Sequence, residues 1–142
     1  MNSNILVAEP CRSDWTSIAK GVRRHLPDAS ILRVKDGEQA LRFTFQTGLL
    51  TREPQIPDLL FLSADLAKVP AEHVLAQVRQ DPRTQATAVL ILWKDRGAAR
   101  TEAFMAREWL FEITDTIALD RQVAEAVRRL CRRKLPRRQP CR

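Results

Sequence analysis

A continuous apolar run at Leu59–Leu62 constrains the fold of this chain more than any other stretch. Pro57 stands shortly before the run, and helical patterns lie on both sides of it. Such a run is typical of a strand that is buried on both faces of a parallel sheet. The strand would end at Ser63-Ala64-Asp65, and open α/β sheets bind ligands at the carboxyl ends of their strands. Any function is therefore expected near Ser63.

The rest of the chain alternates short apolar segments with helical periodicities. Four further segments predict strands, at Asn4–Ala8, Ser30–Val34, Ala88–Leu92 and Trp109–Ile113. Five patterns predict helices, at about residues 14–26, 38–47, 70–80, 96–107 and 118–133. Ser13 or Asp14 is the expected cap of the first helix. With right-handed crossovers, this order predicts an α/β, flavodoxin-like (βα)5 three-layer sandwich whose five-stranded parallel sheet has the order 2-1-3-4-5.

Charge divides the chain into two parts. The net charge is +7, but residues 128–142 contain eight Lys or Arg and no acid. The other 127 residues carry 16 basic and 17 acidic side chains, so they are almost neutral. We expect a single folded domain over residues 1–133, followed by a basic, disordered tail over residues 134–142.

The composition is typical of a soluble protein of a reducing compartment. No apolar run approaches the roughly 20 residues that a membrane-spanning helix needs, and the N-terminus lacks the basic segment of a secretion signal. The three cysteines, Cys11, Cys131 and Cys141, match neither a disulfide framework nor a zinc pattern. A cytoplasmic location is expected.

Taken together, residues 4–130 resemble a two-component response-regulator receiver domain (CheY-like). The segments that carry the resemblance are Ile5–Glu9, Asp36–Leu41, Pro57–Leu62 and Val74–Arg79 with the following Asp81-Pro82. The long loop before the third predicted strand and the Arg-x-Asp-Pro sequence at Arg79–Pro82 resemble single-domain receivers that partner phytochrome-type kinases.

The resemblance implies a phosphorylation pocket whose chemistry has been lost. Receivers take a phosphoryl group on an aspartate after the third strand, with Mg²⁺ on two acids after the first strand. A hydroxyl residue after the fourth strand and a lysine after the fifth bind the phosphoryl oxygens. In this chain the matching positions are Ser63, Glu9 with Pro10, Trp93 and Thr114, and of these only Glu9 keeps the receiver's residue type. We therefore expect a degenerate pseudo-receiver with no catalytic residue, no cofactor and no metal.

The predicted function is that of a stand-alone signalling protein, not an enzyme, which acts as a phosphorylation-independent protein-interaction module. A sensor kinase or a downstream effector of a phosphorelay is the expected partner. The resemblance implies contacts, including a possible homodimer, through the fourth helix, fifth strand and fifth helix. Phe104, Met105 and Trp109 mark that face, and Trp93 was expected beside them in an exposed apolar patch.

Two other interpretations stay open from the sequence. In the first, Asp65 is a displaced phosphoacceptor, and the protein remains a switchable regulator of a two-component phosphorelay. In the second, the tail at residues 134–142 binds nucleic acid or another anionic surface through its basic side chains.

Overall fold

The computed structural model describes residues 3–45, 56–93, 110–113 and 116–133. Its strands are β1 (Asn4–Ala8), β2 (Ser30–Val34), β3 (Leu59–Ser63), β4 (Ala88–Leu92) and β5 (Leu110–Ile113). All neighbouring strands are parallel, and the sheet has the order β2-β1-β3-β4-β5. The described helices are α1 (Arg12–His25), α2 (Gly37–Phe45), α3 (Ala71–Gln80) and α4 (Leu119–Arg133). The predicted α/β, flavodoxin-like class is confirmed, whereas the helix predicted at residues 96–107 lies outside the described residues.

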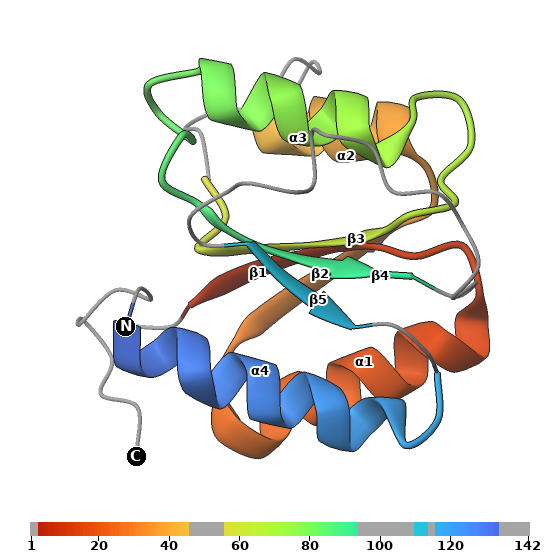
Figure 1. The fold of residues 1–142 in the computed structure, drawn as a ribbon, viewed down its shortest axis with the longest axis vertical. Helices are drawn as coiled ribbons and strands as arrows, with labels where there is room; N and C mark the ends of the chain where they lie inside the picture. Colours follow the sequence, from red (N-terminus) through yellow and green to blue (C-terminus); the bar gives the residue numbers. More distant parts are fainter. Residues whose placement is uncertain (1–2, 46–55, 94–109, 114–115, 134–142) are drawn as a thin grey trace.

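The molecule has three layers (Figure 1). Helices α1 and α4 cover one face of the sheet, and α2 and α3 cover the other. The two central strands β3 and β4 are buried along their whole length, which is why their sequences are continuous apolar runs. Strand β2 lies at an edge and alternates between exposed and more buried residues, as its sequence predicts.

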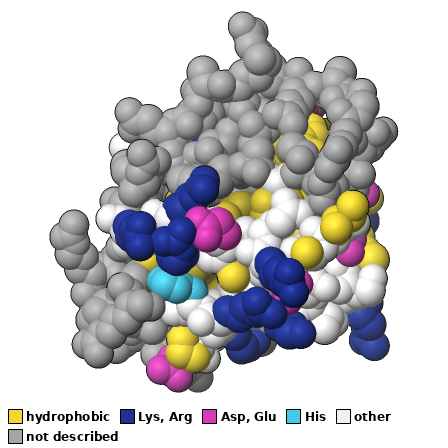
Figure 2. Space-filling model, turned by 60° about the horizontal axis from the view of Figure 1, so that its bottom comes forward, with side chains coloured by type: hydrophobic (Ala, Val, Ile, Leu, Met, Phe, Trp, Pro, Cys, Tyr) yellow, Lys and Arg dark blue, Asp and Glu magenta, His cyan; other side chains and the backbone are white. Residues whose placement is uncertain are grey.

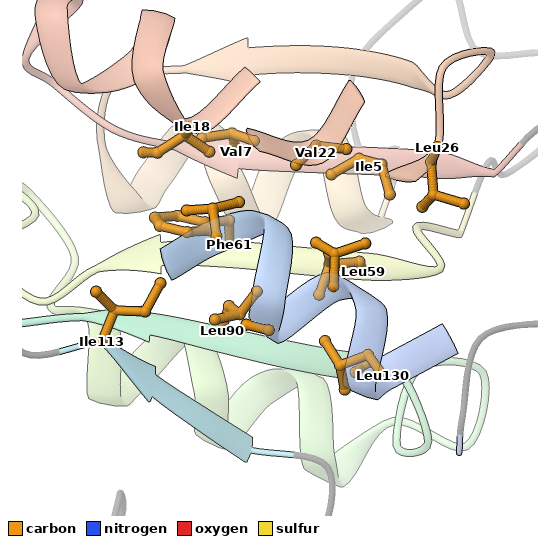
Figure 3. Close-up of a cluster of buried hydrophobic side chains, with 14 of the residues drawn as sticks. Ile5, Val7, Ile18, Val22, Leu26, Leu59, Phe61, Leu90, Ile113 and Leu130 are labelled. Atoms are coloured by element: carbon orange, nitrogen blue, oxygen red, sulfur yellow. The ribbon is translucent and has the colours of Figure 1, made fainter. Parts of the chain in front are cut away.

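Two hydrophobic clusters hold the layers together. Figure 3 shows the cluster between the sheet and the α1/α4 layer, in which Phe61 and Leu90 lie opposite Ile18 and Leu130. A second cluster, which includes Leu62, fills the space between the sheet and the α2/α3 layer. Because the side chains of β3 point alternately to the two faces, this one strand contributes to both clusters. The strand that ends at Ser63 is thereby fixed from both sides.

Two glycines allow unusually close contacts between elements. A Cβ atom at Gly21 in α1 would lie 2.4 Å from the backbone oxygen of Asp120, so α1 and α4 approach nearly to backbone contact. A Cβ atom at Gly37 would lie 1.9 Å from the backbone oxygen of Val69. The first turn of α2 is therefore packed directly against the segment that connects β3 to α3.

The start of α1 differs from the sequence prediction. The helix begins at Arg12 and its N-cap is Cys11, whose side chain makes no capping hydrogen bond to the helix. Instead, the carboxylate of Glu9 accepts the Cys11 backbone N–H at 2.9 Å. Ser13 and Asp14 are thus inside the first turn, and their expected capping role was wrong. Among the described residues, no helix is long and apolar enough to cross a membrane.

Candidate functional site at the carboxyl edge of the sheet

Three residues selected from the sequence meet at one edge of the sheet. Glu9 follows β1, Ser63 ends β3 and Trp93 follows β4. Strand β3 lies between β1 and β4, and the register pairs Ser63 with Leu92, the residue before Trp93. Pro10, the fourth predicted position, is exposed in the loop after Glu9. The topology therefore places these positions at the same edge of the sheet.

The Ser63 hydroxyl is buried and hydrogen-bonded. Its Oγ donates a hydrogen bond to the Oδ1 atom of Asp65 at a distance of 2.5 Å, although the Asp65 residue as a whole is exposed. A serine without a stronger base nearby is a weak nucleophile. The role of the Ser63 hydroxyl is therefore to hold the Asp65 carboxylate at the end of the strand.

Glu9 is fully buried and forms hydrogen bonds with the backbone around it. Its Oε2 atom accepts the Cys11 N–H, and its own N–H donates to the Val34 carbonyl at 3.0 Å. These contacts fix the loop between β1 and α1. A carboxylate with this geometry stabilises the start of α1 whether or not a ligand is present.

A guanidinium group lies against the same loop. Arg33 from β2 donates from Nε to the Glu9 carbonyl at 3.1 Å and from Nη2 to the Pro10 carbonyl at 3.0 Å. In the described part of the chain, no three His, Cys, Asp or Glu side chains gather where they could hold a metal ion. A cation against a loop with one carboxylate does not fit Mg²⁺, which needs oxygen ligands and compensating negative charge. The contact of Arg33 with this loop was not predicted from the sequence. Its one indication there is a charged residue within a predicted edge strand.

Trp93 belongs to the hydrophobic core. Its side chain is 5% exposed and packs in the cluster beneath α2 and α3 with Leu62 and Ile91. Its backbone N–H donates to the Ile113 carbonyl at 2.7 Å. The expectation that Trp93 contributes to an exposed apolar patch was therefore wrong, because the large indole finds more apolar surface to cover inside the molecule than outside.

The segment after Ser63 is fixed by the start of α2. The Gly37 N–H donates to the Ala67 carbonyl at 3.1 Å, and Lys68 adopts a positive φ of 68°. The Lys68 ammonium lies 3.7 Å from Asp36 and 3.9 Å from Glu38. The Asp36-Gly37-Glu38 sequence thus anchors the β3–α3 connection. From the sequence it was interpreted as the start of a helix and as part of the resemblance to receivers, without this contact.

The remaining predicted positions lie outside the described residues. They are Thr114, which the resemblance matched to the lysine position after the fifth strand, the tail at residues 134–142, and the three proposed partner contacts Phe104, Met105 and Trp109.

Comparison with known proteins agrees with this architecture. No family model matches the chain. Its sequence is 27% identical to the response regulator Rcp1 of Synechocystis over 88 residues, which are 62% of this chain and 59% of Rcp1. The phosphorylated cyanobacterial phytochrome response regulator RcpA superposes with a TM-score of 0.79 and 21% identity, over 96% of this chain and 99% of RcpA. The fold is that of a response-regulator receiver domain.

Other receivers of this group give the same result. The Mn²⁺-bound form of Rcp1 has a TM-score of 0.70 and 20% identity, with 87% of this chain and 90% of Rcp1 aligned. The bacteriophytochrome response regulator RtBRR has a TM-score of 0.64 and 20% identity, with 93% and 92% aligned. The similarity to phytochrome-partner receivers, first suggested by local sequence, thus holds for the fold of the whole chain, whereas the sequence match to Rcp1 spans about three fifths of Rcp1.

Proposed function

We propose that this receiver-like protein is a stand-alone signalling protein that acts through protein contacts, without phosphorylation of the residue that ends β3. The observation that carries the proposal is the state of Ser63. Its hydroxyl is buried and hydrogen-bonded to Asp65, where a receiver would present its acceptor carboxylate. The guanidinium of Arg33 on the neighbouring loop supports it, because a fixed cation there opposes Mg²⁺ binding.

The test is phosphorylation by a small donor. The full chain is incubated with Mg²⁺ and acetyl phosphate, or with beryllofluoride, and followed by intact mass and by amide chemical shifts. We expect no added phosphoryl group and no saturable shifts near Ser63. A receiver that retains its acceptor aspartate serves as the positive control. Mg²⁺-dependent, saturable changes around Ser63 would contradict the proposal.

The variant Ser63→Asp sharpens this experiment. Restoring the acceptor alone is expected to leave the protein unphosphorylated, because Glu9 remains the one carboxylate of the β1–α1 loop and Arg33 still lies on it. A hydroxylamine-labile phosphoprotein from this variant would show that the pocket is otherwise competent.

A second candidate function is favoured by the contact between Ser63 and Asp65. An exposed carboxylate 2.5 Å from the Ser63 hydroxyl stands close enough to the receiver's acceptor position to take its place. In that case acetyl phosphate would label the native chain, and Asp65→Asn would abolish the label while Ser63→Ala would not. The two candidates therefore give opposite results in the same assay.

The proposed partner is a cytoplasmic protein, either a sensor kinase or a downstream effector. The contact surface that we propose is the face around Phe104, Met105 and Trp109, which also suits a homodimer. Replacing Met105 and Trp109 with polar residues should leave a folded protein that no longer captures its partner. Unchanged capture by that folded variant would rule this surface out.

A further inference from the structure

The described body contains 15 Lys or Arg and 12 Asp or Glu, and its net charge of only +3 conceals a separation of charge between its layers. Helices α1 and α4 together carry nine Lys or Arg and three acids. The other described residues carry six Lys or Arg and nine acids. The basic side chains of the body are therefore concentrated on one layer, independently of the tail.

The two basic helices lie side by side on the same face of the sheet (Figure 1). Gly21 lets them approach nearly to backbone contact. Figure 2, which turns this layer toward the viewer, shows Lys and Arg side chains gathered over it. Between the helices is a hollow of about 190 Å³, which is lined by Arg24, His25, Arg121, Ala124, Glu125 and Arg128.

Two of the three acids of these helices are paired with arginines. Asp120 lies 2.8 Å from Arg24, and Glu125 accepts hydrogen bonds from both Arg128 and Arg129. These contacts leave an excess of cations. In the described ranges, five exposed Lys or Arg side chains of the two helices form no ion pair: Arg12, Lys20, Arg23, Arg121 and Arg132.

The cations of α4 are spaced along one side of the helix. Arg121, Arg128 and Arg132 follow each other at seven and four residues, so they share one face and span roughly 16 Å. Along duplex DNA, that length corresponds to about five phosphates of one strand. A row of this kind matches a regular series of phosphates.

The chemistry of the surface favours nucleic acid over other polyanions. Eight of the nine cations on α1 and α4 are arginines, whose planar guanidinium binds phosphate oxygens in pairs. Protein interfaces and membrane anchors also need large apolar side chains. The exposed large hydrophobic residues of the described chain are Leu32 on β2, Phe43 on α2 and Ile117 before α4, none of them within α1 or α4. We propose that the α1/α4 face binds the phosphate backbone of nucleic acid, without reading its sequence.

The test uses the full chain and a short fluorescein-labelled DNA duplex, with binding followed by fluorescence anisotropy. The variant Lys20→Glu/Arg121→Glu reverses two exposed cations that have no described ion pair. We expect a loss of affinity of about tenfold or more at low salt. The slope of log affinity against log salt should fall by about two, since each neutralised phosphate contributes about 0.9.

A matched control distinguishes an effect of the α1/α4 face from an effect of the total net charge. Lys35→Glu/Arg42→Glu changes the net charge equally, but Lys35 follows β2 and Arg42 lies on α2, and both are exposed. This variant should bind within about twofold of the native chain if the face and not the total charge matters. Circular dichroism confirms that each variant is folded, and Lys20→Gln/Arg121→Gln replaces the reversal variant if it is not.

Four results would overturn the proposal. The first is that the native chain shows no salt-dependent binding of DNA or RNA. The second is that the reversal variant and the control lose affinity equally. The third is that binding is lost only when residues 134–142 are removed. The fourth is tighter binding to polyglutamate or to phosphatidylserine vesicles than to nucleic acid at the same salt concentration, which would assign the face to an acidic protein or a membrane.

Discussion

At the scale of single residues, Asp81 shows how a local motif sets a pKa. Its side chain accepts hydrogen bonds from the Arg83 guanidinium at 2.8 and 3.0 Å and from the Arg83 backbone N–H at 2.8 Å. These contacts lower the pKa of Asp81 from 3.8 to about 2. The carboxylate follows the third helix in the Arg-x-Asp-Pro sequence that first suggested the phytochrome-type receivers.

The first prediction concerns this titration. Because the pKa of Asp81 is lower in the folded state, the stabilisation is present above pH 3.8 and is lost as the pH falls toward 2. Arg83→Gln should return the pKa of Asp81 toward 3.8, as measured by the carboxyl carbon shift during an acid titration. Arg42→Gln, on another helix, is the control and should leave it unchanged. A pKa near 3.8 in the native chain would contradict the geometry.

The second prediction tests the contact of Ser63 with Asp65. Ser63→Ala and Asp65→Ala should each lower the free energy of unfolding by about 0.5–1.5 kcal/mol, since each removes one hydrogen bond that is partly replaced by water. The double variant should lose little more than either single variant. Urea unfolding of all four proteins gives the coupling energy, and purely additive losses would mean that the hydrogen bond does not form.

At the scale of elements, the contact of α1 with α4 depends on Gly21. A methyl group there would meet a backbone oxygen of α4 at 2.4 Å, and this oxygen cannot turn aside without disturbing its helix. The third prediction is that Gly21→Ala destabilises the protein. Overpacking costs about 1–3 kcal/mol, against a gain of about 1 kcal/mol from the better helix propensity of alanine.

Urea unfolding also checks this third prediction. Lys20→Ala is the control, because Lys20 is the exposed neighbour of Gly21 in the same helix, and its replacement should change stability by less than about 0.5 kcal/mol. A more stable Gly21→Ala variant would mean that the helices lie further apart than described.

The elements themselves were largely predictable, whereas their contacts were not. The bounds of β1, β2 and β4 agree with the prediction because short apolar segments between polar turns define them locally. The strand β3 extends one residue beyond the prediction, to Ser63, and the predicted first residue of β5, Trp109, lies outside the described residues. The cap at Cys11 was missed because Glu9, outside the helix, satisfies its N–H.

The site was predicted as a set of positions and not as a set of contacts. Alternation of strands and helices predicts that Glu9, Ser63 and Trp93 share one edge of the sheet. It does not predict that Arg33 turns onto the β1–α1 loop, because that depends on the pairing of β1 with β2. Nor does it predict the inward packing of Trp93, since a tryptophan after a strand is equally compatible with an exposed position.

At the scale of the whole molecule, the charge is divided between a body and a tail. The described body closes two hydrophobic clusters around the sheet. The tail carries four basic residues and little apolar surface to bury. Its removal should therefore leave the packed core intact.

The fourth prediction follows from this division. Deletion of residues 134–142 should leave the melting temperature within a few degrees of the native value, as measured by circular dichroism. Binding to polyanions should weaken but persist, because the cations of α1 and α4 remain. A large drop in melting temperature would instead indicate that the tail docks on the body.

The burial of Trp93 also bears on how this chain can change over evolutionary time. Returning to a small hydroxyl residue at this position would empty an indole-sized space in the core. Truncating a buried tryptophan costs about 3–5 kcal/mol, a large share of the 5–15 kcal/mol that typically separates folded from unfolded proteins. A small hydroxyl residue at this position would therefore be tolerated only if neighbouring residues of the α2/α3 layer also changed and refilled the space. Single substitutions of this kind at Trp93 are thus closed to this chain, whereas coordinated ones are not.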